Sequence, residues 1–566
     1  MERHRVLLIG ATGVFGQRLA RHLALTEELE LFLSSRDADK AAHLARGLVT
    51  AAGTTATGIG LDHHNDLAER LAAIAPWLVI DASGPFQSAG YGVPRAALEA
   101  GAHVVDLADA RDYILGYGAA LNELARSKGL VALAGASSTP ALSVAATMEL
   151  IRGWARVDTI EIAIAPGGRS PVGEAVIAAI LSYVGRPIPI WREGELQDTT
   201  GWLDSRVAAM PCLRRQRVAA VETVDAQWLG PSLGVTSHVA FRAGLESPIE
   251  QWGLMLLARL RQAGLVGELH KLIPALLAAR RLTRLPTSNR GGMLVRVTGL
   301  DDQALLRHSH WSLVAERGDG PQVPTLGAAA ALRALLGGAL EPGARPGADA
   351  IPLGWIEAEM APYAITTQVE SVAHGPAIIR KALGEAAFAA LPEPLRHFHS
   401  AEGVPVWRGR ARIANGGNRV ARLLRWIIGL PAASADVPVT VSVERLVGKH
   451  GPTEIWTRNF DGRRFSSQLD LDPQGCLRER FGPTAFRLGL TARDGQIHLP
   501  VLAAQLFRLP LPHFLLPRSE AVESLDDEGR FTFDVKLTLP FFGLLVHYSG
   551  WLVPKAGTGP ITPPDA

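Results

Sequence analysis

The chain has 566 residues, of which 47% are hydrophobic and 20% are charged, and its formal net charge is +2. This length exceeds one ordinary hydrophobic core and predicts two or three domains. The near-neutral charge gives no reason to expect a nucleic-acid partner.

Cysteine content and hydropathy point to a cytoplasmic location. The two cysteines, Cys212 and Cys476, lie far apart and lack metal-site spacing, which favours a reducing compartment. The long uncharged windows 129–148 and 537–554 contain proline and several polar residues, so no transmembrane helix is expected.

A glycine-rich turn follows the first apolar run, residues 6–9. Gly10 permits a tight turn, Gly13 lets the backbone approach a pyrophosphate, and Gly16 allows close packing of helix on strand. Phe15, Leu19 and Leu23 then mark one face of a helix. A strand, a glycine turn and a helix in this order predict a dinucleotide-binding loop, with phosphates at the helix N-terminus.

The second predicted strand, 29–36, ends in Ser35-Arg36. An NAD site usually has an acidic residue at about this distance from the loop. Arg36 suits the 2′-phosphate of NADP instead, and Ser35 can add a hydroxyl donor. The sequence therefore favours NADP over NAD.

Apolar runs and helical segments continue to alternate up to residue 135. Further strands are predicted at 59–62, 77–83, 103–107 and 130–135. Strands that alternate with helices form a parallel sheet covered on both faces. Residues 1–135 are therefore predicted to be an α/β domain with a Rossmann-type doubly wound parallel sheet.

Short-chain dehydrogenases are a rival class with a similar glycine loop, and they require a Tyr-x-x-x-Lys pair. None of the six tyrosines of this chain is followed four residues later by lysine, and Tyr91 is followed by Arg95. Arginine does not release its proton in proteins, so the sequence argues against this class.

Several segments resemble the saccharopine dehydrogenase-like oxidoreductases over roughly the first 340 residues. They are GATGVFGQRLARHL (10–23), DASGPFQSAGYGVPRAALEAGAHVVDLAD (81–109), GASSTPALS (135–143) and GDGPQVPTLGAAAALRALLGG (318–338). The resemblance implies that a returning helix at 324–340 completes the nucleotide domain. It also implies that residues 136–323 form an α+β substrate and dimerisation domain, and hence a homodimer.

The candidate site residues lie at the carboxyl ends of the predicted strands, where a doubly wound sheet binds its ligand. Ser83 and Gly84 are expected to line the nicotinamide end, with Pro85 and Phe86 excluding water. The full expected cofactor set is Gly10, Thr12, Gly13, Val14, Phe15, Gly16, Ser35, Arg36, Asp62, Ser83, Gly84, Pro85 and Phe86. Tyr91 and Asp106 are the proposed catalytic proton donors, although Asp106 could equally cap a helix.

Residues 251–282 are apolar with interspersed Arg and Lys. They predict an amphipathic packing helix or lid, and peripheral membrane contact is the alternative. The Gly- and Pro-rich stretch that follows the returning helix predicts a linker over 341–384.

Strict alternation at 436–446 and 530–539, with Asp-Gly turns at 461–462 and 494–495, indicates antiparallel strands. Residues 385–556 are therefore predicted to form a C-terminal antiparallel β-rich domain. They resemble an uncharacterised β-rich domain fused behind saccharopine dehydrogenase-like modules. Its apolar face either covers its own core or encloses a ligand.

The leading hypothesis is an NADP-dependent oxidoreductase that transfers hydride to or from a small-molecule or lipid-like substrate. The resemblance implies a C=N or C=C bond as the acceptor, with an apolar or carrier-bound substrate. The alternative is a non-catalytic NADP-binding scaffold or a lipid-associated binding protein. No metal site is predicted, because His308-x-His310 and His397-x-His399 each lack a third ligand at suitable spacing.

Overall fold

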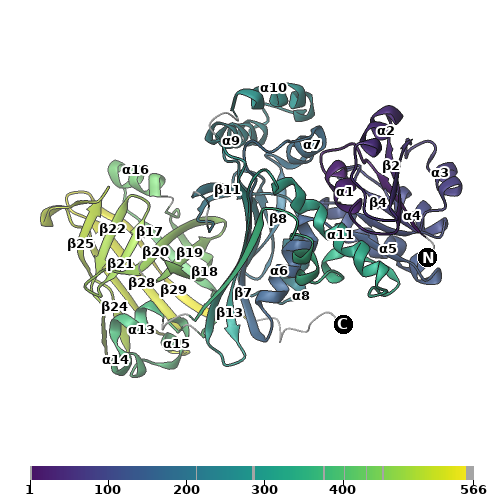
Figure 1. The fold of residues 1–566 in the computed structure, drawn as a ribbon. Coiled ribbons are helices and arrows are strands. Elements are labelled where there is room, and N and C mark those ends of the chain that lie inside the picture. Colours follow the sequence, from purple (N-terminus) through teal and green to yellow (C-terminus); the bar gives the residue numbers. More distant parts are fainter. Residues whose placement is uncertain are drawn as a thin grey trace.

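Three β-sheets organise the chain in the computed structural model, which describes residues 3–211, 213, 215–283, 287–373, 377–400, 402–428, 430–448 and 451–555. The sheets stand in a row, with the N-terminal sheet A at one end, sheet B in the centre and the C-terminal sheet C at the other end (Figure 1). Cys212 lies outside the described residues, and Cys476 is a free thiol. No helix in the described part of the chain is long and apolar enough to cross a bilayer.

Sheet A is fully parallel and confirms the predicted Rossmann-type architecture. Its strand order is β15-β6-β5-β4-β1-β2-β3, which contains the strand order of a dinucleotide-binding fold. The strands are β1 (His4–Ile9), β2 (Leu29–Ser35), β3 (Thr55–Gly60), β4 (Leu78–Asp81), β5 (His103–Asp106), β6 (Val131–Ala134) and β15 (Gly343–Pro346).

Helices cover both faces of sheet A. Residues Val6 and Leu8 of β1 pack in one core with α1, whereas Leu7 and Ile9 pack in the core of the opposite face. The first face carries α1 (Gly16–Leu23), α6 (Ser143–Leu150), α11 (Val323–Leu336) and α12 (Leu353–Ala358). The second face carries α3 (Leu67–Ile74), α4 (Gly92–Glu99) and α5 (Arg111–Ser127), while α2 (Ala38–Arg46) contacts β2 and β3.

Sheet B is mixed and follows the order β10-β11-β12-β7-β13-β14-β16, with the β8–β9 hairpin paired to β12. Only the β12–β7 pair is parallel among these described strands. The strands are β7 (Trp154–Ala165), β8 (Pro187–Arg192), β9 (Glu195–Thr200), β10 (Ser205–Ala208), β11 (Gln216–Ala220), β12 (His238–Ala243), β13 (Gly291–Asp301), β14 (Leu306–Ala315) and β16 (Ile365–Ala373). The helices inserted around them are α7 (Glu174–Tyr183), α8 (Asp225–Ser232), α9 (Pro248–Gln262) and α10 (Ile273–Thr283).

The stretch 341–384 is not the simple linker that its composition predicts. β15 adds a parallel edge strand to sheet A, and β16 adds an edge strand to sheet B. A four-residue strand that ends in Pro346 is tolerated only at an edge, and its Gly and Pro content hides it from pattern analysis. β16 is mostly exposed and therefore lacks the apolar alternation that would reveal it.

Sheet C is antiparallel throughout and confirms the predicted C-terminal β-rich architecture. Three short helices, α13 (Ile378–Leu383), α14 (Glu385–Ala389) and α15 (Glu393–Phe398), precede it, and α16 (Arg419–Ile428) lies between its first two strands. The strands are β17 (Val406–Asn415), β18 (Ser434–Gly448), β19 (Gly451–Phe460), β20 (Arg463–Leu471), β21 (Leu477–Phe481), β22 (Thr484–Leu488), β23 (Thr491–Arg493), β24 (Gln496–His498), β25 (Val501–Leu506), β26 (Leu509–Pro510), β27 (Arg518–Leu525), β28 (Phe531–Leu539) and β29 (Gly543–Pro554). Both predicted Asp-Gly turns form hairpins, β19–β20 and β23–β24.

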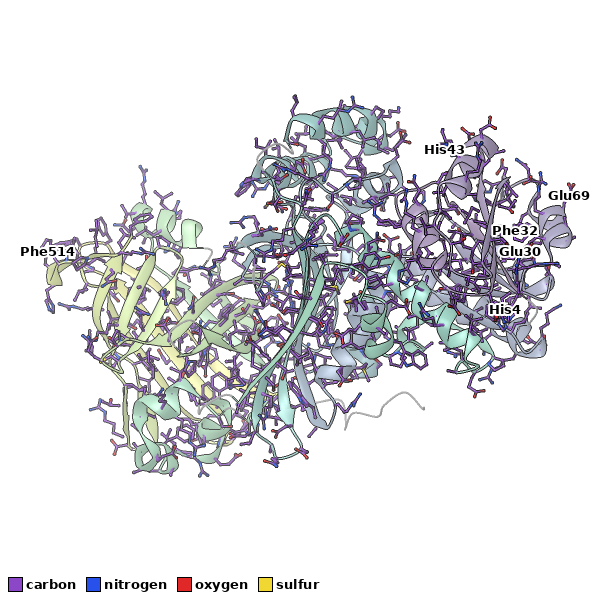
Figure 2. The ribbon with its side chains drawn as sticks, viewed as in Figure 1. His4, Glu30, Phe32, His43, Glu69 and Phe514 are labelled. Carbon is purple, nitrogen blue, oxygen red and sulfur yellow. The ribbon has the colours of Figure 1, made fainter. Side chains whose placement is uncertain are left out.

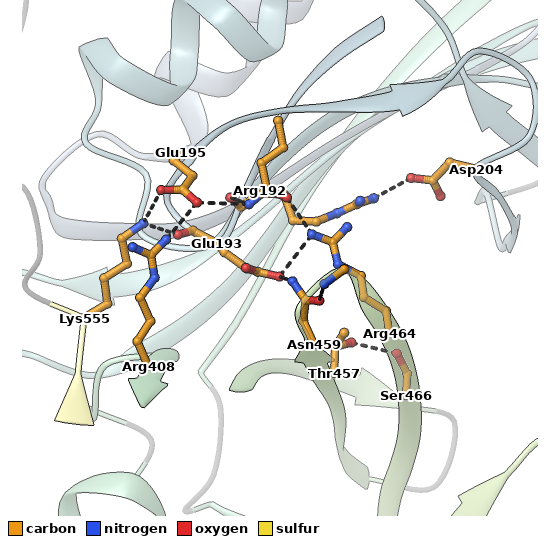
Figure 3. A network of polar contacts seen from close by, with 12 residues as sticks. Arg192, Glu193, Glu195, Asp204, Arg408, Thr457, Asn459, Arg464, Ser466 and Lys555 are labelled. Carbon is orange, nitrogen blue, oxygen red and sulfur yellow. Dashed lines mark hydrogen bonds and ion pairs between the residues drawn. The ribbon is translucent and has the colours of Figure 1, made fainter. Parts of the chain in front are cut away.

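The β8–β9 hairpin joins sheet B to sheet C through a polar network (Figure 3). Lys555 donates to the backbone carbonyl of Glu193, and Arg464 lies 3.4 Å from the carboxylate of the same residue. Arg408 pairs with Glu195 at 2.8 Å. Because Glu193 is buried, its carboxylate is held by these partners rather than by water.

Candidate functional site

The glycine loop closes tightly over the end of β1. A Cβ on Gly10, whose φ is 74°, would lie 2.9 Å from the Ala82 carbonyl oxygen, so only glycine fits this turn beside β4. A Cβ on Gly16 would lie 2.1 Å from the Gly10 carbonyl oxygen. Gly13 is exposed, and its Cβ would meet only the Gly10 oxygen, at 3.2 Å. The loop therefore offers open backbone at Gly13, directly ahead of the helix N-terminus, where free N–H groups favour anions.

The end of β2 is tied to this loop. The Thr12 hydroxyl donates to Ser35 Oγ at 2.9 Å, and the Asp37 N–H donates to the same oxygen at 3.3 Å. Ser35 Oγ thus accepts twice and keeps its own proton for a ligand. Arg36 is exposed beside it.

The acidic residue next to Arg36 is engaged elsewhere. Asp37 caps α2, accepting from the Lys40 N–H at 3.1 Å, and it pairs with the Lys40 ammonium at 3.1 Å. These hydrogen bonds hold the pKa of Asp37 below its usual range. Arg36 is therefore the charged side chain offered to a ligand at the end of β2.

Asp62 lies in the turn that follows β3. It accepts hydrogen bonds from the His64 N–H at 3.1 Å and from the Asn65 side-chain amide at 2.8 Å. The bond from His64 contributes most to lowering its pKa. Asp62 holds this turn in shape, at the same edge of the sheet as Ser35.

The segment after β4 is anchored by a buried carboxyl group. Asp81 accepts from the Ser83 N–H at 2.9 Å and from the Ser83 hydroxyl at 2.6 Å. Pro85 is exposed after a cis Gly84-Pro85 peptide bond, while Phe86 is buried against the ring of Tyr113. Pro85 rather than Phe86 therefore faces the surface beside the loop.

The two proposed proton donors both form hydrogen bonds with other residues of the nucleotide domain. Asp106 is 1% exposed and accepts from the N–H groups of Ala108 (3.0 Å) and Gly135 (2.8 Å) and from the Tyr113 hydroxyl (3.0 Å). Burial raises its pKa to about 7, and the nearby Asp81 carboxyl adds to the shift. The Tyr91 hydroxyl donates to the Tyr113 carbonyl at 3.0 Å. This arrangement suits residues that position the strand ends.

A second set of titratable groups lies where sheet A faces the sheet B region. Gln87 donates to Asp109 at 3.0 Å, and Arg111 lies 3.4 Å from Glu222. Asp109 is exposed, and desolvation by neighbouring protein atoms raises the pKa of its carboxyl. Burial also raises the pKa of Glu222; the Arg111 charge opposes this shift, while Asp112 and, to a smaller extent, Asp109 add to it. Burial raises the pKa of Tyr183, and the nearby carboxylates of Asp109 and Glu222 raise it further.

Sequence reasoning missed this acidic cluster. Asp109 follows the predicted fifth strand by only two residues, so its position at the carboxyl edge of the sheet was available as a signal. Glu222 follows β11 in no recognisable motif, and only the fold brings it to Arg111. The sheet B region also approaches the glycine loop. A Cβ on Gly173, which directly precedes α7, would lie 3.3 Å from the Val14 side chain.

The segment 135–143, which leads out of the nucleotide domain, is held in place by one buried carboxyl group. Asp225 at the start of α8 accepts from the hydroxyls of Thr139 and Ser143, each at 2.5 Å. Burial raises its pKa, and the two hydroxyls oppose that shift. These bonds hold the segment 135–143 against the sheet B region.

The inner face of sheet C is filled mainly by its own side chains. Phe398 stacks on Phe531 with ring centres 4.2 Å apart, and its neighbours leave a cavity of about 40 Å³. This space is far smaller than the ~300–1,000 Å³ of a small-molecule pocket, so the inner face is mainly a core. His399 ends a helix and pairs with Glu523 at 2.6 Å, so His397 and His399 do not share a strand. Among the described residues, no group of three His, Cys, Asp or Glu side chains is arranged to hold a metal.

Comparisons with known proteins agree with this architecture. Residues 6–133 match the family model for the Saccharopine dehydrogenase NADP binding domain, and residues 391–552 match the Domain of unknown function (DUF4166). The predicted resemblance of these two segments is thereby confirmed. No curated protein gives a significant match.

Solved structures give partial structural matches. Saccharopine dehydrogenase (L-Glu forming) from Saccharomyces cerevisiae is 13% identical, with a TM-score of 0.46 over 65% of this chain and 100% of that one. DAP dehydrogenase from C. glutamicum is 17% identical, with a TM-score of 0.34 over 63% and 96%. Amine dehydrogenase from Mycobacterium smegmatis is 15% identical, with a TM-score of 0.32 over 62% and 96%.

Proposed function

We propose that the protein is an NADP-dependent oxidoreductase whose reaction takes place between the carboxyl edge of sheet A and the sheet B region. The observation that carries the proposal is the combination of the glycine loop with exposed Arg36 at the end of β2. The match of residues 6–133 to an NADP-binding domain supports the same cofactor.

The residues present fit NADP. Gly13 leaves backbone open to a pyrophosphate, and Ser35 and Arg36 present a hydroxyl and a guanidinium where the 2′-phosphate would lie. The acidic neighbour Asp37 is committed to α2, so it does not compete as a partner for a ribose hydroxyl. When bound, the nicotinamide ring supplies or accepts the hydride.

Asp109 and Glu222 are the proposed acid–base groups in place of Tyr91 and Asp106. Glu222 is half-buried, and this burial raises the pKa of its carboxyl, the direction that favours proton exchange with a substrate; Asp109 lies beside it. A carboxylate at this position would also stabilise a cationic nitrogen. This charge favours reduction of a C=N bond over reduction of a C=C bond. The remainder of the substrate is proposed to be apolar or carrier-bound.

Cofactor binding tests the proposal. Fluorescence titration with NADPH and NADH is carried out on the wild type, on Arg36→Ala and on the control Arg46→Ala, which removes an exposed arginine from the end of α2. The wild type and the control should prefer NADPH, and Arg36→Ala should lose about tenfold of that preference, since one charge-assisted contact is worth ~1.5–3 kcal/mol. Equal affinities of the wild type for the two nucleotides would overturn the assignment.

The second candidate is a non-catalytic NADP-binding scaffold or lipid-associated protein. The engagement of Tyr91 and Asp106 by the protein favours it, because it removes the first two proton donors. In this candidate, residues 251–282 provide the membrane contact, since Trp252, Leu256 and Leu282 of α9 and α10 are exposed.

NADPH consumption with cyclic imines, amine–carbonyl pairs and enoyl thioesters separates the two candidates. Turnover of the C=N compounds that falls in Glu222→Gln but persists in Tyr91→Phe supports the enzyme. Binding of NADPH without consumption across the panel supports the scaffold. A homodimer formed through the sheet B region is proposed for either case, with sedimentation velocity as its test.

A further inference from the structure

One end of sheet C gathers the turns of several hairpins. The strand register places the end of β17, the start of β18 and the β28–β29 turn together, because Asn415 pairs with Val546 and Ile413 pairs with Ser434. The β21–β22 and β25–β26 turns belong to the same end, since Thr484 pairs with Leu506. Helix α16 lies here too. We call this surface the tip, made of residues 416–428, 507–518 and 540–542.

The tip carries large apolar side chains in water. Phe541 is 81% exposed, Phe507 72%, Leu509 71% and Phe514 65%. Every phenylalanine that is strongly exposed within the described part of the chain lies at the tip, including Phe542. Figure 2 shows Phe514 at the extremity of the molecule, far from sheets A and B. Side chains that protrude from turns in this way do not cover a core of this chain.

The backbone at these positions disfavours the residues that occupy it. Phe507, Arg508 and Phe541 have φ values of 50°, 71° and 65°, a left-handed conformation that costs a residue with a Cβ about 1–2 kcal/mol. The β19–β20 turn at the same end uses Asp461 and Gly462, which suit that conformation. Phenylalanine at the other turns is therefore unfavourable for folding, which points to a role for its side chain outside the fold.

Within the tip segments the exposed charged side chains are arginines, while the acidic residues at the same end of the sheet lie outside these segments, Asp461 in the β19–β20 turn and Asp436 paired with Arg410. Arg419, Arg422, Arg508 and Arg518 are exposed. The segments 416–428, 507–518 and 540–542 contain no aspartate or glutamate. Exposed apolar side chains with arginines around them are complementary to a surface that is negatively charged on the outside and apolar beneath.

We propose that the tip docks peripherally on an anionic phospholipid bilayer, with the phenylalanines in the acyl region and the arginines at the headgroups. A bilayer accommodates separate protruding side chains without a preformed pocket, whereas a protein partner needs a matching contiguous surface. Docking here would hold the whole chain at the membrane, with sheets A and B joined to sheet C through the Glu193 network.

The α9–α10 surface provides a matched comparison. It lies on the same upper side as α16 in Figure 1, and it also exposes apolar residues, including Trp252 and Leu256. Arg217 stacks over Trp252 at 5.1 Å, so this tryptophan already has a partner within the protein. The tip and the α9–α10 surface can be altered independently.

Vesicle sedimentation with the full chain tests the proposal, using phosphatidylcholine alone or mixed with phosphatidylglycerol. The tip variant is Phe507→Asn/Phe541→Asn, because asparagine tolerates the left-handed conformation and should not weaken the fold. The control is Trp252→Ser/Leu256→Ser, and thermal unfolding checks each protein. A third variant, Arg419→Gln/Arg422→Gln, probes the charge.

The wild type should bind the anionic vesicles, and binding should weaken with salt. The tip variant should bind at least about tenfold more weakly, since each fully buried phenylalanine contributes ~1.5–3 kcal/mol. The arginine variant should lose about fivefold per residue, while the control should match the wild type. Absence of wild-type binding, equal binding by the tip variant, or a comparable loss in the α9 control would overturn the proposal. Self-association that the tip variant abolishes would also overturn it and assign the tip to a second copy of the chain.

Discussion

Substituting alanine at Gly16 and at Gly13 separates the packing role of the glycine loop from its binding role. The new Cβ at position 16 would lie 2.1 Å from the Gly10 oxygen and 2.9 Å from Ala11 Cα, so α1 must move away from β1. Overpacking of this kind costs about 1–3 kcal/mol, and the helix propensity of alanine offsets at most about 1 kcal/mol. Because the clashing atoms belong to the backbone, the cost should lie in the upper part of this range, and we expect a net loss of about 1–2 kcal/mol, which lowers Tm by about 2–8 °C.

Gly13→Ala is the matched variant. Its Cβ would lie 3.2 Å from one backbone oxygen, which small adjustments can relieve, so Tm should change little. The methyl group would instead stand where the pyrophosphate approaches, and NADPH should bind at least about tenfold more weakly. Differential scanning fluorimetry and NADPH titration measure both effects. Unchanged stability in Gly16→Ala, or unchanged NADPH affinity in Gly13→Ala, would refute this reasoning.

Two further predictions concern buried carboxyl groups. Because the pKa of Asp106 is raised to about 7 in the folded state and is about 3.9 when unfolded, the folded state keeps its proton while the unfolded state loses it. The free energy of unfolding should therefore fall as pH rises from about 4 to 7. The variant Asp106→Asn should flatten this part of the Tm–pH profile. Parallel profiles of the wild type and the variant would contradict the raised pKa of Asp106. At the junction of sheets B and C, Glu193→Gln should lower the free energy of unfolding by about 1–3 kcal/mol, because it leaves the Arg464 charge poorly solvated. Glu195→Gln should lower it by less than about 1 kcal/mol, because the Glu195 side chain is 46% exposed. Calorimetry in which both variants melt alike would count against a stabilising role for the Glu193 network.

The architecture was predictable where local pattern and tertiary environment agree. The apolar runs of sheet A and the strict alternation at 436–446 and 530–539 are buried as their patterns indicate. The edge strands β15 and β16 were missed because edge position removes the need for buried alternation. The sequence left two alternatives for the apolar face of sheet C, a core or a ligand cavity, because the outcome depends on how the aromatic rings of distant strands meet.

The geometry of the glycine loop was predictable from the sequence, whereas the engagement of Tyr91 and Asp106 by other parts of the fold was not. Glycine spacing identifies the loop, because its backbone geometry is local. Contacts across the fold decide which side chains are engaged: the Tyr91 hydroxyl donates to the Tyr113 carbonyl, while Glu222, a proposed acid–base group, comes from the sheet B region. No sequence spacing encodes these long-range contacts.

Amide hydrogen exchange with and without NADPH tests the central claim most directly. If the cofactor binds as proposed, saturating NADPH should slow exchange in residues 10–16, 35–37 and 83–87, and the strands of sheet C should stay unchanged. Protection confined to sheet C, or no protection at saturating NADPH, would contradict the assignment of this loop as the dinucleotide site.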